Sequence, residues 1–133
     1  MGQIIHPVGI VKVFPSAART ATVASIDFTN DVSMGIALFL DVSAVSGTGA
    51  TLDLSVQWKD PISGAYFTIG SFAQKTLAGG VTTDDLMIHP ALTVVTNRKL
   101  SALLPRVWRV NAVIGGTPPI SWTFSLAGYY FGS

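Results

Sequence analysis

The stretch TLDLSVQW, residues 51–58, alternates apolar and polar side chains with a period of two. Its four apolar side chains, from Leu52 to Trp58, share one face, because successive side chains of a β-strand point to opposite sides. Residues 107–114 and 120–126 show the same alternation. The pattern predicts half-buried antiparallel strands, each with one face on a core and one face outward.

The remaining apolar runs are short and lie between Gly, Pro, Ser and Asp turns. Residues 34–42, MGIALFLDV, are apolar on both faces and indicate a central strand or one covered by a neighbour. Weaker strands are expected at residues 8–13, 20–28, 65–73 and 86–94. The best helix candidate, residues 93–104, predicts at most one short turn. We expect an all-β fold: an antiparallel β-sandwich, jelly-roll or Ig-like Greek key, with about eight strands.

A hairpin is predicted over residues 55–72. Asp60-Pro61 starts its turn, since proline pre-sets φ at the first central position, and glycine at position 64 suits the left-handed region. Trp58 lies in the apolar register of its strand and is interpreted as core. Tyr66 is offset by one residue from the apolar positions of the second strand and is expected to face outward.

Two stretches share one plan: DVSAVSGTGATLDLSV (41–56) and RVNAVIGGTPPISWTFSL (109–126). Each has V-x-A-V, then a Gly-Thr pair, then an alternating strand. The interpretation is two long hairpins that turn at Gly47-Thr48 and Gly116-Thr117, where glycine permits a positive φ. The hairpins could lie opposite each other as a pseudo-symmetric pair, or they could have met the same turn requirement independently.

Length and composition indicate one domain over residues 1–133, with residues 1–20 as a candidate N-terminal arm. The absence of cysteine excludes disulfides and cysteine-ligated zinc. Charged residues make up 11% of the chain, against about 25% in a typical soluble domain. Either Ser and Thr maintain solubility or copies and partners cover much of the surface, and we favour the second explanation. No apolar run is long enough for a membrane span, and residues 4–14 make a poor signal peptide.

Few residues suit catalysis or metal binding. Asp84 and Asp85 are the only close carboxylates; on a strand they would point to opposite faces, and a solvated turn is expected. His6 and His89 each precede proline, which places both at strand ends or turns. The chain has no nucleophile-elbow motif. We therefore expect no enzyme activity, no metal and no cofactor.

Basic residues do not indicate nucleic-acid binding. The net charge is +1, and the nearest approach to a basic patch is Arg98, Lys99, Arg106 and Arg109. These are interpreted as isolated charges rather than the basic stripe of a nucleic-acid-binding domain.

The tail LAGYYFGS, residues 126–133, has three consecutive aromatic residues near the chain end. Exposed aromatic side chains there would be costly, so we expect them to dock on the domain or on a neighbouring copy. The candidate interface residues are Ile4, Ile5, Pro7, Tyr66, Tyr129, Tyr130 and Phe131. A sugar-binding alternative would use Trp58, Tyr66 and Trp108 as stacking surfaces.

Two segments, residues 39–74 and 104–128, resemble small β-sandwich proteins encoded among the structural genes of tailed bacteriophages. The shared features are the "DVSAVSGT" stretch, the "QW…SG" turn, and an "LPR…RV…GGT…P" segment that leads to a "TFSL" strand. The resemblance implies a virion component assembled in the host cytoplasm, most specifically a head decoration or cement protein. Its expected partners are the major capsid protein or other virion proteins and further copies of itself. A neck or tail component is the nearest alternative.

Overall fold

The computed structural model describes residues 9–132. Nine strands and one turn of 3₁₀ helix make up its regular structure. They are β1 (Ile10–Arg19), β2 (Val23–Ala24), β3 (Phe28–Thr29), β4 (Gly35–Lys59), β5 (Tyr66–Ser71), β6 (Lys75–Thr76), η1 (Leu77–Gly79), β7 (Thr82–Ile88), β8 (Lys99–Leu100) and β9 (Val107–Phe131). All pairs are antiparallel except β7 with β8.

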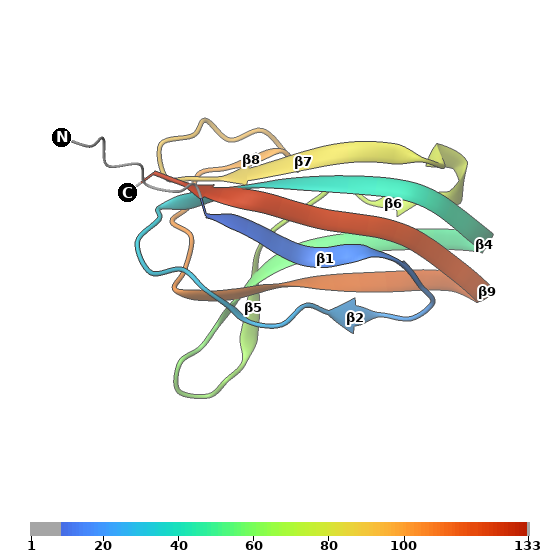
Figure 1. Cartoon of the computed structure of the whole chain (residues 1–133), viewed down its shortest axis with the longest axis horizontal. Helices are drawn as coiled ribbons and strands as arrows, with labels where there is room; N and C mark the ends of the chain where they lie inside the picture. The colour runs from blue at the N-terminus through green and yellow to red at the C-terminus, as the bar shows by residue number, and fades with distance from the viewer. Residues whose placement is uncertain (1–8, 133) are drawn as a thin grey trace.

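The central feature is a ribbon of two very long strands. β4 and β9 have 25 residues each and pair from Gly35 opposite Phe131 to Trp58 opposite Trp108. Figure 1 shows both strands curving at the right-hand end and running back, so the ribbon is folded over on itself. The two limbs of the ribbon give the molecule two half-sheets.

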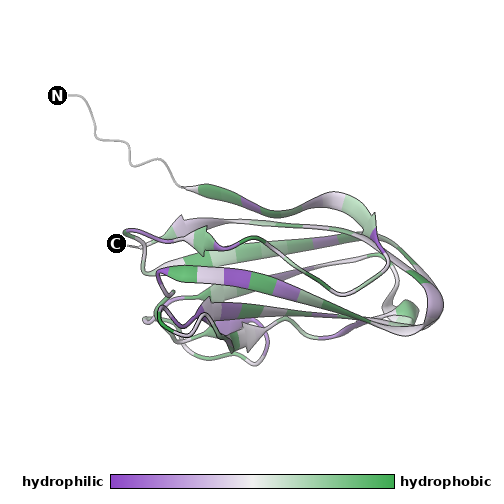
Figure 2. Cartoon of the chain, turned by 90° about the horizontal axis from the view of Figure 1, so that it is seen from below, coloured by the Kyte–Doolittle hydropathy of each residue, from purple (hydrophilic) through white to green (hydrophobic). Residues whose placement is uncertain are grey.

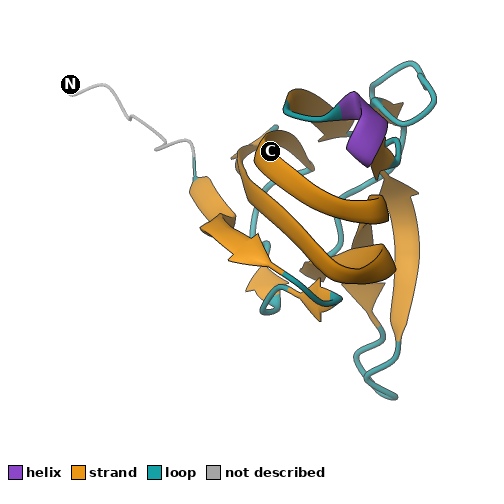
Figure 3. Ribbon diagram, turned by 90° about the vertical axis from the view of Figure 1, so that its right-hand side faces the viewer, coloured by secondary structure: helices purple, strands orange, loops and turns teal. Residues whose placement is uncertain are grey.

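Half I consists of β1, β7, β8, residues 35–46 of β4 and residues 121–131 of β9. Half II consists of β2, β3, β5, β6, residues 51–59 of β4 and residues 107–115 of β9. Figure 3 shows the curved ribbon end-on, with the flanking strands beside it. Hydrogen bonds join all nine strands in one sheet. The all-β prediction is therefore confirmed, whereas two separate sandwich sheets are not.

One apolar cluster lies on the inner faces of both halves. Figure 2 shows apolar and polar residues alternating along the strands. Leu38 and Phe124 of half I and Leu54 and Trp108 of half II are buried in this cluster. The alternation that begins at residue 51 thus predicted the inner face correctly up to Val56, and it gives the core its large side chains.

At the fold-over each strand bends back but pairs with the other long strand rather than with itself, so the two predicted glycine hairpins are wrong. Each strand continues through its Gly-Thr pair, and Thr48 lies opposite Thr117. The two similar stretches do lie opposite each other, as one of the two alternatives held. Gly47 has φ +117° and Gly116 has φ +122°; a Cβ on Gly47 would lie 2.7 Å from the Pro119 carbonyl oxygen. Glycine is needed here for the positive φ at the bend and for the close passage of the two backbones, not for a hairpin turn.

The predicted hairpin over residues 55–72 is confirmed as β4, a turn and β5. The Asp60 N–H donates to the Ala65 carbonyl at 2.8 Å, and Gly64 has φ +77°. Residues 93–104, for which at most one short helical turn was predicted, hold β8 and irregular loop. The one helical turn of residues 9–132 is η1.

Both described ends of the chain lie at the same end of the molecule. Ile10 lies opposite Tyr129 in the sheet, and the Tyr130 N–H donates to the Gly9 carbonyl at 3.0 Å. Because Ile10–Arg19 is a strand of the sheet, the candidate arm over residues 1–20 stays a prediction only for residues 1–8, outside the described residues.

Candidate functional site

The three C-terminal aromatic side chains point in different directions. Tyr129 lies on the outer face of half I, is 44% exposed, and packs edge-on against Phe39 with ring centroids 5.5 Å apart. Phe131 stacks on His89 at 5.1 Å. Phe131 is thus docked within the molecule, while Tyr129 is available to a partner.

Tyr130 points inward and links the two half-sheets. The Trp108 indole Nε1–H donates to its hydroxyl oxygen at 3.2 Å, and the two rings meet at 82°. Burial raises the pKa of Tyr130, the Trp108 hydrogen bond lowers it, and the charge of Asp31 raises it. Tyr129 and Tyr130 were both predicted to be interface residues. Because successive side chains of a strand alternate, they lie on opposite faces of β9. Ile4, Ile5 and Pro7 lie outside the described residues.

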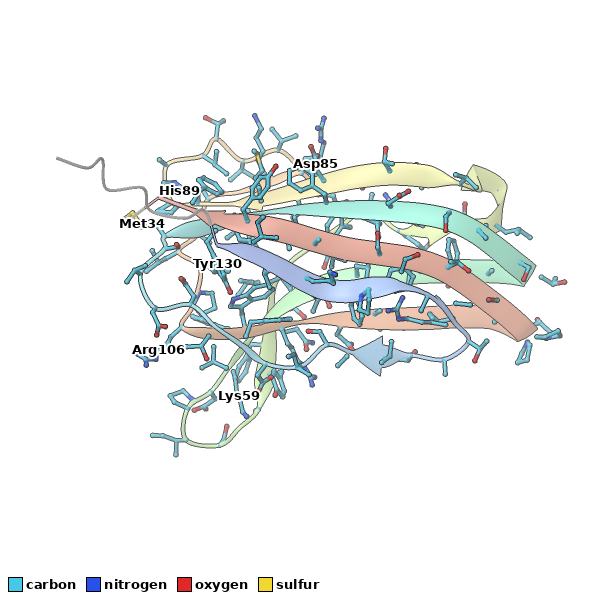
Figure 4. The ribbon with its side chains drawn as sticks, viewed as in Figure 1. Met34, Lys59, Asp85, His89, Arg106 and Tyr130 are labelled. Atoms are coloured by element: carbon cyan, nitrogen blue, oxygen red, sulfur yellow. The ribbon has the colours of Figure 1, made fainter. Side chains whose placement is uncertain are left out.

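Tyr66 belongs to a polar network on the outer face of half II. Its hydroxyl donates to Asp27 Oδ1 at 2.7 Å, and Lys59 Nζ lies 3.0 Å from Asp27 Oδ2. The Arg109 guanidinium lies 3.4 Å from the Tyr66 ring centroid, and its Nε–H donates to Gln57 at 2.8 Å. The Tyr66 bond, ahead of Lys59, lowers the pKa of Asp27. Tyr66 therefore already has internal partners; Figure 4 labels Lys59 at the base of the hairpin.

Trp58 was predicted to be core, and that prediction is wrong. Trp58 and its strand neighbour Trp108 lie opposite each other, yet Trp108 is fully buried while Trp58 is 47% exposed. Trp58 is at the end of β4, next to the projecting β4–β5 turn. Phe67, opposite Trp58 on β5, is 53% exposed. The pair lines a shallow hollow of about 240 Å³ with Pro61.

Asp84 and Asp85 lie within β7, so the predicted solvated turn is wrong. They point to opposite faces, as alternation requires. Asp84 pairs with Lys75 of β6 and so joins half I to half II. Asp85 pairs with Arg98 at 3.0 Å. Neither carboxylate is positioned to act with the other on one substrate atom.

The remaining candidates for chemistry are dispersed. His89 follows the end of β7, as predicted, and its Nδ1 accepts the Ala91 N–H at 3.0 Å. Arg106 lies 3.7 Å from Asp31. Within residues 9–132, no group of three or more His, Asp or Glu side chains could hold a metal ion.

The outer face of half I lacks a polar network like that around Tyr66; its internal contacts are the Phe39–Tyr129 ring pair and the ion pair of Asp85 with Arg98. Its side chains form three rows across the strands, because the register of each pair is fixed. The rows, read from β1 to β7, are Ile10, Tyr129, Ala37 and Met87; then Lys12, Ala127, Phe39 and Asp85; then Ser125, Asp41 and Thr83, with no β1 member. We call this surface the row face.

The row face is apolar at its centre and charged at its margins. Ile10 is 79% exposed and Phe39 is 42% exposed. A hollow of about 750 Å³ lies beside Phe39, and its lining includes Asp41, Ser125 and Ala127. Figure 4 labels Asp85 at the β7 side of this region. Such a face has the character of an interface: an apolar centre with a polar rim.

Sequence reasoning missed the row face because alternation assigns a side chain to a face but not to a neighbour. Phe39 was read only as part of an apolar run. Its position between Ala127 and Asp85 depends on the register of β4 with β9 and with β7, which pairs residues far apart in the chain.

No family model, curated protein or solved structure matches the chain. Among residues 9–132, none of the helical structure has the length and apolar character that crossing a membrane requires. The function is therefore argued from the surfaces described above.

Proposed function

We propose that the chain is a non-enzymatic structural protein of a virus particle, specifically a decoration or cement protein on the head of a tailed bacteriophage. One observation carries the proposal: sixteen large apolar side chains of the described residues are exposed, while only 11% of the chain is charged. They are Ile10, Val23, Ile26, Val32, Met34, Phe39, Trp58, Ile62, Phe67, Leu77, Val81, Val94, Val95, Leu103, Val113 and Tyr129.

Such a surface favours association over a free existence in solution. Each Å² of apolar surface that a neighbour covers contributes about 25 cal/mol, less the cost of ordering the partners. The partners are the major capsid protein or other virion proteins, and further copies of this chain. The resemblance of residues 39–74 and 104–128 to structural proteins of tailed phages supports the same setting.

The arrangement of charged groups also supports a structural role. Three of the four ion pairs in the described part join different strands or connect a strand to a loop: Lys59 with Asp27, Lys75 with Asp84, and Arg98 with Asp85. These contacts hold the half-sheets and their edges in place. A lattice element needs such rigidity, because its binding surfaces must keep their shape from copy to copy.

The experiment is mass spectrometry and cryo-electron microscopy of purified particles from the source of the sequence. We expect the chain in many copies on the outer surface of the head. Purified protein added to heads that lack it should raise the melting temperature of the capsid. Absence of the chain from purified particles would refute the proposal, and density at the neck or tail would move the role there.

A sugar-binding role is a second candidate, favoured by the exposure of Trp58 and Phe67. Aromatic side chains exposed in this way can stack on a sugar ring. However, Trp108 is buried and Tyr66 is already bonded to Asp27, so two of the three expected stacking residues are unavailable. Binding on a glycan array that is lost in Trp58→Ala would favour this role over the first.

A further inference from the structure

The row face is complementary to itself in size. In the central row, Phe39 of β4 lies beside Ala127 of β9; in the neighbouring row, Tyr129 of β9 lies beside Ala37 of β4. Each row thus pairs one large aromatic side chain with one alanine, and the order reverses from one row to the next. Ala37 is 5% exposed, so it forms the floor between Tyr129 and Met87. A flat partner would leave a gap over Ala127, which helps to line the hollow beside Phe39.

The row face is also complementary to itself in charge. Lys12 stands at the β1 end of the central row and Asp85 at the β7 end. The four ion pairs of the described part do not include Lys12 or Asp41. Asp85 accepts both Arg98 hydrogen bonds on Oδ1, which leaves Oδ2 for a further donor.

We propose that the row face binds the row face of a second copy, across a two-fold axis that runs along the strands between β4 and β9. Such an axis places β9 over β4 of the second copy, and β1 over β7. The two sheets then pack face to face with their strands nearly aligned, about 10 Å apart. The interface is isologous: both copies use the same residues.

In this arrangement the large side chains of one copy lie over the alanines of the other, and opposite charges face each other. Phe39 packs on Ala127 of the second copy and enters the hollow of about 750 Å³ that Ala127 helps to line. Tyr129 lies over Ala37 of the second copy and packs beside Met87, the next side chain of that row. Lys12 faces Asp85, and the Ser125 hydroxyl faces the Asp41 carboxylate. A second copy is the chosen occupant because one symmetry operation satisfies the size order and the charge order together.

The contact is small, which sets the expected strength. Four strands about 4.8 Å apart and three rows about 7 Å apart give roughly 400 Å² per copy, about half of the ~800 Å² per partner in a standard interface. The free dimer is therefore weak, and copies held side by side on a lattice gain from high effective concentration. The dimer itself is argued from the row face. That it forms on a virus particle rests on the proposed function.

The first test exchanges the large and small side chains. Sedimentation velocity of the full chain, up to millimolar concentration, measures the dimer constant without any particle present. Phe39→Ala removes the large side chain and Ala127→Phe fills the hollow, so each weakens dimerisation by about tenfold or more. In the double variant, which carries both changes, β9 supplies the large side chain in place of β4. Its dimer dissociation constant should return to within about threefold of the native value.

The second test exchanges charges between copies. Lys12→Asp alone and Asp85→Lys alone each place like charges in contact twice per dimer, so each weakens self-association. An equimolar mixture of the two single variants forms a heterodimer in which both contacts are attractive. Circular dichroism shows that each variant is folded, and Val113→Ala, on the outer face of half II, leaves the dimer constant unchanged.

Restoration in both exchanges would support the dimer. The proposal is overturned if the native chain stays monomeric at every concentration, or if folded double variants and mixtures fail to recover what the single variants lose. Because the measurement contains no capsid, such a failure is separate from failure to bind particles. A chain that stays monomeric but binds heads would keep its proposed function and lose only this dimer.

Discussion

The two half-sheets share a ribbon and a core but differ on their outer faces. On half II, Tyr66, Asp27 and Arg109 satisfy one another through hydrogen bonds, an ion pair and a cation–π contact. On half I, Phe39 and Tyr129 are exposed, and the four ion pairs of the described residues do not include Lys12 or Asp41. The inner faces must be alike because they enclose one core. The outer faces are free to differ, and the difference separates a surface that stabilises the monomer from one that can bind a neighbour.

The largest expected effect comes from the core that both halves share. Trp108→Ala should lower the free energy of unfolding by about 3–5 kcal/mol, because it opens a cavity beneath Phe28 and Tyr130. Trp58→Ala, its cross-strand neighbour, is the matched control and should cost less than about 1 kcal/mol because the side chain is 47% exposed. Urea unfolding of both variants measures the difference. Equal losses would mean that Trp58 is core after all.

The second effect concerns the contact that joins the halves. Tyr130→Phe leaves the buried Trp108 N–H without its acceptor and should cost about 1–3 kcal/mol at neutral pH. The raised pKa of Tyr130 means that its contribution is complete below pH 10.0, the unperturbed value, and is lost as pH rises through the higher folded-state pKa. Thermal melts between pH 8 and 11 should show a flatter alkaline limb in the variant. An unchanged limb would contradict the assignment.

The smallest effect distinguishes the two outer faces directly. Asp27→Asn removes the charge that Lys59 and Tyr66 share, and should lower stability at pH 7 by less than either change above. The lowered pKa of Asp27 makes its contribution present above pH 3.8, the unperturbed value, and lost as pH falls through the lower folded-state pKa. Asp41→Asn, on the row face, should leave the unfolding of dilute protein unchanged. A larger loss of unfolding free energy in Asp41→Asn than in Asp27→Asn would contradict the stated difference between the two outer faces.

The sequence predicted strand content well because alternation is a local signal. Residues 51–58, 107–114 and 120–126 all lie in strands, and their predicted inner side chains face the core with the exception of Trp58. The two Gly-Thr pairs were wrongly predicted to be hairpin turns. In the sequence, a glycine in a hairpin turn cannot be distinguished from a glycine in a bent strand that lies close to a neighbouring backbone. Only the pairing of Thr48 with Thr117, about 70 residues apart in the chain, distinguishes the two cases.

The candidate site was less predictable, since it depends on neighbours and on where a core ends. Trp58 continues the apolar register of Leu54 and Val56, but it lies beyond the part of half II that the other half covers. Tyr66 was expected to face outward, and its bond to Asp27, from a distant segment, could not be read from spacing. Among the interface candidates in residues 9–132, Tyr129 is the one that lies exposed on the row face.

The neighbouring positions of the two ends of the described part, residues 9 and 132, have a mechanical consequence. Ile10 opens β1 beside Tyr129, near the end of β9, so a pull that separates the ends acts across the strands. Such a force loads the backbone hydrogen bonds between β1 and β9 one after another, so β1 separates from β9 progressively from its first residue. The long β4–β9 ribbon, whose curved end lies far from both points of attachment, would keep its shape until β1 had been stripped off.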